Sequence, residues 1–295
     1  MTPRSGDVLD EGPIPRRRVA FAFDAATAPR DFYAGDPVLS SLMAALSLLF
    51  PEGERFFVES VVHFEDRIDD PDLARTIRDF AAQEGMHSKA HVAFNALVEA
   101  QGHRVVAELE RGVRRLLRRG RRVHSPEGRL AVTCALEHFT AILAEQLLGD
   151  ERHRAALDAA VRDLWLWHAL EETEHKAVAF DVYRRVDGSW SRRARVMLLT
   201  TVMFVGFASY CHARLLAERG LLGDVRGLVR ATSYLWIRPG LFRKLVPAYL
   251  DYFRPGFHPH DRDSSALVAA WRERLFGPAG TLRRAGVHAS RSATG

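Results

Sequence analysis

The chain has 295 residues, of which 47% are hydrophobic, and a formal net charge of +5. This apolar content is enough to bury one substantial core and a smaller appended unit, which excludes a fibrous or largely disordered chain. The two cysteines, Cys134 and Cys211, are far apart in apolar stretches, so the sequence does not support a disulfide framework or a CxxC metal site. We expect a reducing, cytoplasmic setting. The modest basicity fits solubility or an anionic partner and alone decides nothing.

The beginning of the chain, MTPRSGDVLDEGPIPRRR, mixes acids, prolines and arginines without an apolar core. It is therefore not typical of a secretory signal. We expect residues 1–36 to form an N-terminal arm, with a short strand or extended segment at residues 19–23. A helix is expected from about residue 37 to residue 50, ending at the Phe50-Pro51 break.

The next two segments predict an antiparallel helical hairpin. Apolar and acidic residues recur at helical spacing from Gly53 to Ile68, and Pro71 after two aspartates begins a second helix that extends to about residue 100. One stripe of this second helix carries titratable residues among apolar ones: Leu73, Ile77, Phe80, Glu84, His87, His91, Phe94 and Val98.

A second hairpin follows a long connection at residues 102–124. Ser125 and Pro126 begin a helix that ends at Gly149, and a long helix follows Asp150 to about Val186. Two short hairpins joined by a long crossover are typical of ferritin-like bundles. We therefore predict an all-α fold, in which a ferritin-like four-helix bundle at residues 37–190 has additional N-terminal and C-terminal helices.

The composition changes beyond residue 190. We predict a helical extension at residues 191–277 packed on the bundle, and a disordered tail at residues 278–295. The uncharged stretch 196–211 is about 24 Å long as a helix, which is short for a bilayer span. A buried helix is the preferred interpretation, and an interfacial helix with peripheral membrane contact is the alternative.

The connection at residues 102–124 predicts an amphipathic helix. Val106, Leu109 and Val113 share one side with Leu116 or Leu117, and many arginines occupy the other. A crossover helix with solvated arginines is preferred over one that binds anionic lipid. No nucleic-acid motif accompanies the charge, so no nucleic-acid partner is expected.

Two Glu-x-x-His pairs are the main indication of a functional site in the sequence. In Glu84–His87 and Glu172–His175 the carboxylate and the imidazole lie one turn apart on the apolar face of their helix. Such pairs on two helices, with one inward glutamate from each of the other two, form the ligand set of di-iron and di-manganese bundles. Burying these carboxylates without a cation would be strongly unfavourable.

The remaining ligands are less strongly indicated. Glu137 faces inward on the third bundle helix. In the first hairpin, Glu54 lies about as far before the turn as Glu84 and His87 lie beyond it, which favours Glu54 over Glu59 or Glu65. His91 and His168 lie one turn from the two pairs, as additional ligands, partners behind a ligand, or hydrogen-bonded core histidines. Glu171 is the alternative to Glu172, and Glu145 is a further candidate. This ligand set predicts two divalent metal ions, with iron first and manganese or zinc as alternatives.

At FPEGERFF (50–57), QEGMHSKAH (83–91), ALEHFTA (135–141) and WHALEETEHKAVAFDVY (167–183), the chain resembles a bacterial family of predicted metal-dependent hydrolases. The likeness covers most of residues 15–275. It implies a metal site at Glu54, Glu84, His87, Glu137, Glu172 and His175, and it places His91 and His168 inside matched motifs. The wider similarity to ferritin-like di-iron proteins implies oxygen-dependent oxidation as readily as hydrolysis.

Three functions are compatible with this site. Oxygen-dependent oxidation of a small substrate is the leading hypothesis, and it requires an external electron donor because the sequence holds no ferredoxin-like or flavin motif. The alternative is a two-metal hydrolase that uses a metal-activated water. Ferroxidase or metal storage is a third hypothesis, which the long C-terminal extension disfavours. The apolar extension and the basic connection together favour a hydrophobic, lipid-like substrate.

Overall fold

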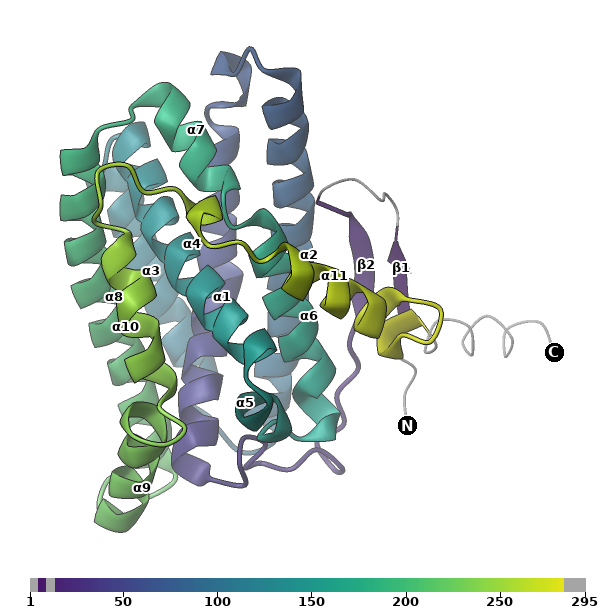
Figure 1. Ribbon diagram of the computed structural model, residues 1–295. Coiled ribbons are helices and arrows are strands. Elements are labelled where there is room, and N and C mark those ends of the chain that lie inside the picture. Colours follow the sequence, from purple (N-terminus) through teal and green to yellow (C-terminus); the bar gives the residue numbers. More distant parts are fainter. Residues whose placement is uncertain (1–4, 9–13, 284–295) are drawn as a thin grey trace.

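The structure, a computed structural model, describes residues 5–8 and 14–283. Within these residues the fold is all-α, as the sequence predicts. Long helices run side by side along the molecule (Figure 1). Two short strands, β1 (Ser5–Val8) and β2 (Arg17–Ala20), pair antiparallel beside the bundle, with Ser5 opposite Ala20. Of the predicted tail, residues 284–295 lie outside the described residues, and Leu282 is fully buried.

The first hairpin consists of α1 (Pro37–Val62) and α2 (Pro71–Ala100), joined by the 3₁₀ turn η1 (Glu65–Arg67). Each helix begins with an aspartate cap followed by a proline: the Asp36 side chain accepts from two backbone N–H groups of α1, and the Asp70 side chain does the same for α2. These caps satisfy donors that a helix start would otherwise leave without partners.

The predicted break at Pro51 is wrong, because α1 continues through this residue. A proline inside a helix removes the hydrogen bond to the carbonyl four residues earlier, here that of Ser47. The side-chain amide of Asn95 on α2 lies 3.5 Å from this Ser47 oxygen and offers a replacement donor. Packing against the neighbouring helix therefore offsets a local signal that the sequence alone interprets as a helix end.

The second hairpin consists of α4 (Pro126–Gly149) and α6 (Ala159–His175), with the short α5 (Glu151–Ala155) in the turn. The turn is thus longer than the sequence indicates, and its centre lies close to residue 155. The predicted fourth helix is also interrupted: α6 ends at His175, and α7 (Val178–Val186) continues after a two-residue turn. The break coincides with Lys176, whose buried ammonium donates to Glu145 and to Ser264 in the C-terminal extension.

The crossover contains α3 (Val106–Val123), which is amphipathic as predicted, with Val106, Leu109 and Val113 buried. The C-terminal extension adds α8 (Trp190–Glu218), α9 (Val225–Trp236), α10 (Leu241–Asp251), the turn η2 (Pro259–Asp261) and α11 (Ser265–Phe276). In Figure 1, α8 and α10 cover one side of the bundle, whereas α11 lies on the opposite side near the β-hairpin.

Helix α8 differs from the preferred prediction of a buried helix. Only 22% of its most apolar segment is buried, and Leu199 and Val202 are 63% and 71% exposed. Among the described residues, α8 is the one helix that is long and apolar enough to cross a membrane by length and composition. Large apolar side chains exposed along one helix are unusual for a soluble surface.

Two separate apolar clusters fill the bundle. One contains Leu48, Phe94, Leu148 and Leu164, and the other contains Phe56, Phe80, Leu130 and Val182. Along α1, α2 and α4, the nearest buried residues of the two clusters lie eight to ten positions apart: Leu48 and Phe56, Phe80 and Ala90, and Cys134 and Ala144. The predicted ligand set occupies this intermediate layer, so apolar packing holds the layer from both ends: Glu54, Glu84, His87, Glu137, Glu172 and His175.

Truncation of Leu130 to alanine tests the contribution of this packing. Leu130 is completely buried, so we expect the free energy of unfolding to fall by about 2–5 kcal/mol. The matched change of the exposed Val202 to alanine should alter it by less than about 0.5 kcal/mol. Urea unfolding followed by circular dichroism measures both values. Equal effects at the two positions would contradict the arrangement of the core.

Candidate metal centre

Nine glutamate and histidine side chains gather in the polar layer, and all of them are buried. They come from four helices: Glu54 from α1; Glu84, His87 and His91 from α2; Glu137 from α4; and His168, Glu171, Glu172 and His175 from α6. These include the six residues of the predicted ligand set: Glu54, Glu84, His87, Glu137, Glu172 and His175. Their atoms form four overlapping groups of three, within each of which the candidate ligand atoms lie within 4.8 Å of one another.

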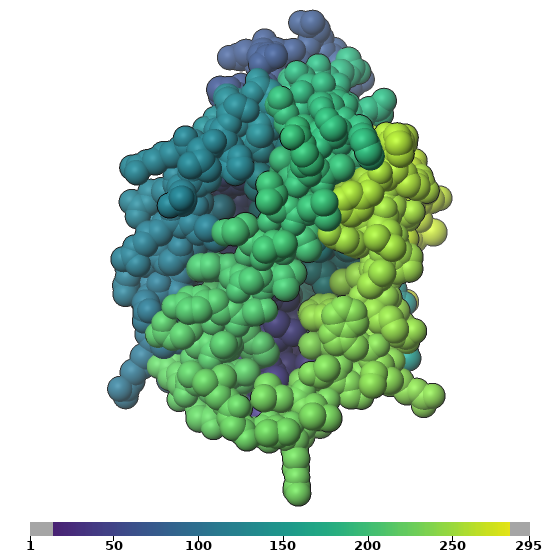
Figure 2. Space-filling model, turned by 90° about the vertical axis from the view of Figure 1, so that its left-hand side faces the viewer, coloured from purple at the N-terminus to yellow at the C-terminus, as the bar shows by residue number. Residues whose placement is uncertain are grey.

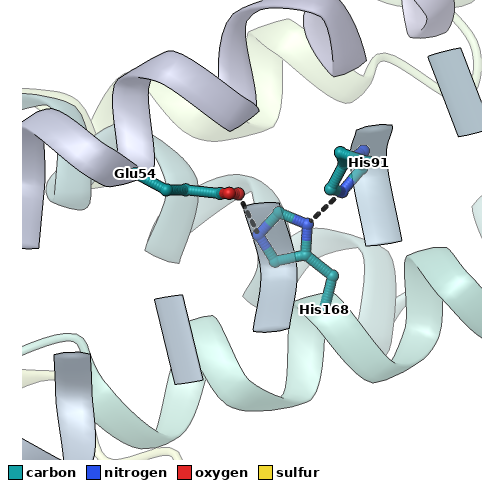
Figure 3. A group of neighbouring side chains, drawn as sticks. All are labelled: Glu54, His91 and His168. Carbon is teal, nitrogen blue, oxygen red and sulfur yellow. Dashed lines mark hydrogen bonds and ion pairs between the residues drawn. The ribbon is translucent and has the colours of Figure 1, made fainter. Parts of the chain in front are cut away.

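Two of these groups share Glu84. One consists of Glu84, Glu137 and His175, and the other of Glu54, Glu84 and His87. His168 and Glu172 lie beside the second group, because His168 Nε2 is 2.9 Å from Glu172 Oε1 and 3.9 Å from Glu54 Oε1. Figure 3 shows how His168 lies between Glu54 and His91. These overlapping groups could hold metal ions.

The spacing of the atoms fits metal coordination. Two ligand atoms on one ion lie about 3.0 to 3.5 Å apart when each metal–ligand bond is about 2.1 Å long. His175 Nε2 lies 3.2 Å from Glu84 Oε1 and 3.6 Å from Glu137 Oε2. His87 Nδ1 lies 3.5 Å from Glu172 Oε1. These separations are suitable for atoms that share an ion.

The hydrogen-bond pattern supports the same conclusion. Both carboxylate oxygens of Glu54, Glu84 and Glu137 are buried without a hydrogen-bond partner, as are His87 Nδ1 and His175 Nε2. Buried polar atoms are nearly always paired, and leaving so many unpaired in one layer would be costly. All of these atoms face the layer, so divalent metal ions bound there would satisfy them together.

Each histidine next to the cluster is oriented by a hydrogen bond on its outer nitrogen. His87 Nε2 donates to Glu171 at 3.0 Å, which leaves Nδ1 facing the cluster. His175 Nδ1 donates to Gln83 Oε1 at 2.8 Å, which leaves Nε2 facing it. The amide of Gln83 donates in turn to Glu174 at 3.1 Å, and this fixes which end of the amide meets His175. Such partners behind a ligand set its orientation and basicity.

Arg17 on β2 contacts the two carboxylates behind His87 and His175, which are Glu171 and Glu174. Its guanidinium is 2.8 Å from Glu171 and 2.7 Å from Glu174, and all three side chains are almost completely buried. Arg272 on α11 also contacts Glu174, at 2.6 Å. The N-terminal strand and the C-terminal helix therefore support the outer side of the cluster. Sequence periodicity did not indicate Arg17, Gln83 or Glu174, because these contacts join residues far apart in the chain.

A third chain of hydrogen bonds determines the tautomer of His168. Glu110 on α3 can only accept when ionised, so the Asn95 amide nitrogen donates to it at 3.1 Å, and the Asn95 oxygen accepts from Ser47 at 2.7 Å. Ser47 then accepts from His91 Nδ1 at 2.8 Å, and His91 Nε2 accepts from His168 Nδ1 at 2.6 Å. His168 Nε2 is consequently left without a proton, and it faces Glu172.

The two remaining candidates lie against other partners. Glu171 accepts from Arg17 and His87, so the geometry favours Glu172 over Glu171 as a ligand. Glu145 accepts from Lys176 and Ser264 and does not join the cluster. Of the alternatives for α1, Glu59 pairs with Arg121 and Glu65 with Arg78, both away from the layer.

The electrostatics of the cluster indicate bound protons when no metal is present. Burial raises the pKa of the Glu54 and Glu137 carboxyls well above the usual range, and the neighbouring charge of Glu84 raises both further. Burial by itself would lower the pKa of His87 and His175, but the hydrogen bond of His87 to Glu171 and the negative charge of Glu172 beside His175 raise these two pKa values well above the usual range. Burial lowers the pKa of His168, which favours its neutral form.

Metal binding should therefore release protons and strengthen as the pH rises. The groups with raised pKa hold protons at low pH, and a metal ion must displace them, so affinity falls as the pH decreases. Chelator-competition titrations with Zn²⁺ at several pH values measure this dependence. The variant His138→Gln alters a buried histidine outside the cluster and should keep the same slope. An affinity that does not change with pH would contradict protonation of the metal-free cluster.

Removal of the Ser47 hydroxyl should weaken metal binding through His168. In Ser47→Ala, His91 loses the acceptor that fixes its tautomer, and loss of such a partner typically costs about tenfold in metal affinity. The control Ser41→Ala removes another serine of α1, which bonds only its own helix backbone at Pro37. Nitrogen-15 NMR of the imidazoles should also show a proton on His168 Nδ1 in the wild type. A proton on Nε2 would contradict the chain of donors.

Comparison with known proteins agrees with this geometry. A family described as predicted metal-dependent hydrolase matches residues 15–263, a range that includes all of the bundle and most of the C-terminal extension. No curated protein and no solved structure matches the chain. The matched range contains every glutamate and histidine of the buried cluster, and the chain belongs to this family of predicted metal-dependent hydrolases.

Proposed function

We propose that the chain is a two-metal hydrolase, in which divalent ions in the polar layer activate a water molecule. The observation that carries this proposal is the set of unpaired, buried ligand atoms from four helices, arranged in two groups that share Glu84. The family of predicted metal-dependent hydrolases supports the same chemistry. Iron, manganese and zinc all suit a site of carboxylates and imidazoles.

The two positions would differ in their ligands. Glu84, Glu137 and His175 would hold one ion, and Glu54, Glu84 and His87 would hold the other, with Glu84 common to both. We infer that His168 is an additional ligand of the second position, because its unprotonated Nε2 lies 2.9 Å from a Glu172 oxygen. Two lone pairs at this distance repel each other unless a proton or a metal ion lies between them.

Bound metal ions would polarise the substrate and lower the pKa of a coordinated water, which is the chemistry that two-metal hydrolases use. The protein residues would keep the imidazoles in fixed tautomers through Glu171, Gln83 and His91. The two apolar clusters on either side would exclude bulk water from the layer.

A small cavity gives access to the cluster. It measures about 100 Å³, and its lining includes His168 and Glu172 together with apolar residues such as Phe50, Trp165 and Phe204. The substrate bond would reach the metal ions from this side, because His168 and Glu172 belong to both the cavity and the cluster. An apolar approach favours a hydrophobic substrate.

The family supports hydrolysis over the oxygen-dependent oxidation that ligand chemistry alone favours. Oxidation would use the same ligands but would also need an oxygen-reactive metal and an external reductant. Neither the family nor the apolar cavity beside the cluster supports iron storage. Oxygen-dependent oxidation at the same site is the competing hypothesis.

Hydrolysis of an acyl ester by protein loaded with Fe²⁺, Mn²⁺ or Zn²⁺ tests the proposal. We expect an ester such as p-nitrophenyl butyrate to be cleaved at the same rate with and without oxygen, and metal removal to abolish the activity. Glu84→Gln should lower kcat/KM by about 100-fold or more, because it alters the ligand shared by both positions.

The control variant Glu145→Gln changes a partly buried glutamate outside the cluster and should keep most of the activity. Melting curves should establish that both variants fold. Consumption of oxygen by the iron-loaded protein with a reductant, without ester cleavage under any metal, would replace hydrolysis by the oxidative hypothesis.

A further inference from the structure

We propose that the substrate is a long-chain acyl ester, whose hydrocarbon chain lies in a second, larger cavity next to the one that reaches the cluster. This inference rests on the proposed hydrolytic function for the reaction, but not for the binding of the chain. The larger cavity measures about 350 Å³ and lies between α1, α3, α4 and α8. On the face shown in Figure 2, the surface is hollowed on both sides of the green α8, and purple atoms of α1 are visible in the hollows.

The lining of the larger cavity is almost entirely apolar. Phe56 and Phe57 come from α1, Leu136 from α4, and Met203 and Phe207 from α8. The polar side chains in the lining are Arg119, His124, Thr140 and Thr200. A sugar, peptide or nucleotide would bury many polar groups here without partners, at considerable cost. An unbranched hydrocarbon chain carries no such groups and fits this chemistry.

The two cavities are neighbours that share part of their lining. Phe50, Thr140 and Phe204 contribute to both. Ligand pockets usually measure about 300–1,000 Å³, so the smaller cavity alone is too small for a ligand, whereas the larger one lies within this range. The bulk of a substrate would therefore occupy the larger cavity, and its reacting end would pass Thr140 to reach His168 and Glu172.

The reaction at that end would be ester hydrolysis. The bond between the acyl carbon and the ester oxygen breaks, and the oxygen of water bonds to the acyl carbon. One hydrogen of the water passes to the departing alcohol, and the second is released from the new carboxylic acid as a proton at neutral pH. Water is the only co-reactant, and no oxidant or reductant is needed.

Binding of a fluorescent acyl ester tests the cavity separately from the reaction. Methyl cis-parinarate is uncharged, so the metal-depleted carboxylates do not repel it, and its fluorescence rises in an apolar environment. We expect it to bind the metal-depleted protein, to be displaced by methyl palmitate, and to resist displacement by methyl butyrate. Equal displacement by the long and short esters, or no binding, would overturn the inference.

A pair of glycine substitutions tests where the hydrocarbon chain of the ester binds. Gly120 on α3 lines the larger cavity, and a Cβ placed there meets no atom within 4 Å, so Gly120→Leu fills the cavity without a clash in the helix. It should weaken binding of methyl cis-parinarate by about tenfold through lost apolar contacts. Gly206→Leu is the matched control, because Gly206 on α8 is exposed, equally open, and lines neither cavity.

The outcomes distinguish this inference from the proposed function. Selective binding of long esters that Gly120→Leu weakens, without cleavage by metal-loaded protein, would support the acyl site and reject hydrolysis. Cleavage of short esters at the cluster, with unchanged binding of methyl cis-parinarate in Gly120→Leu, would support hydrolysis and reject the acyl site. Both variants should melt close to the wild type, since neither touches the bundle core.

Discussion

The structure depends on how the bundle neutralises several carboxylates in one buried layer. Glu54, Glu84, Glu137 and Glu172 come from four helices and converge where water cannot solvate them. Isolated buried carboxylates would be so unfavourable that the layer must hold protons or metal ions. The apolar clusters above and below compensate by fixing the helices on both sides.

The orientation of the histidines follows from three further carboxylates that accept hydrogen bonds behind them. Glu171 fixes His87 directly, Glu174 fixes His175 through Gln83, and Glu110 fixes His168 through Asn95, Ser47 and His91. A carboxylate oxygen accepts hydrogen bonds, so each chain has one direction, and each leaves the inner nitrogen of its histidine facing the cluster. The fold itself thus orients the candidate ligands.

The sequence predicts the layer well because it depends on local periodicity. Glu-x-x-His spacing places Glu84 with His87 and Glu172 with His175, and depth in the hairpin selects Glu54, which the structure brings into the same cluster. The helical class follows from the same periodicity. Contacts between distant segments cannot be predicted in this way. Arg17 meets Glu171 across 154 residues, and no spacing in the sequence indicates it.

The errors in the predicted elements also come from contacts between distant segments. Pro51 is a strong local signal for a helix end, but Asn95 on another helix approaches the carbonyl that the proline leaves unpaired. The exposure of α8 is a property of the assembled surface, since an apolar helix in sequence is equally compatible with a buried position. Local patterns give residue types and faces, whereas the neighbours of each face are determined only by the tertiary fold.

The contact between Glu174 and the two arginines has a consequence for synthesis of the chain. Arg17 is made before the bundle helices, whereas Arg272 on α11 lies more than two hundred residues later, and both bind the same carboxylate. A nascent chain on the ribosome can form the bundle helices before α11 has emerged. The full set of contacts behind Gln83 and His175 has to wait for α11, so the final geometry of the cluster is a late event in maturation.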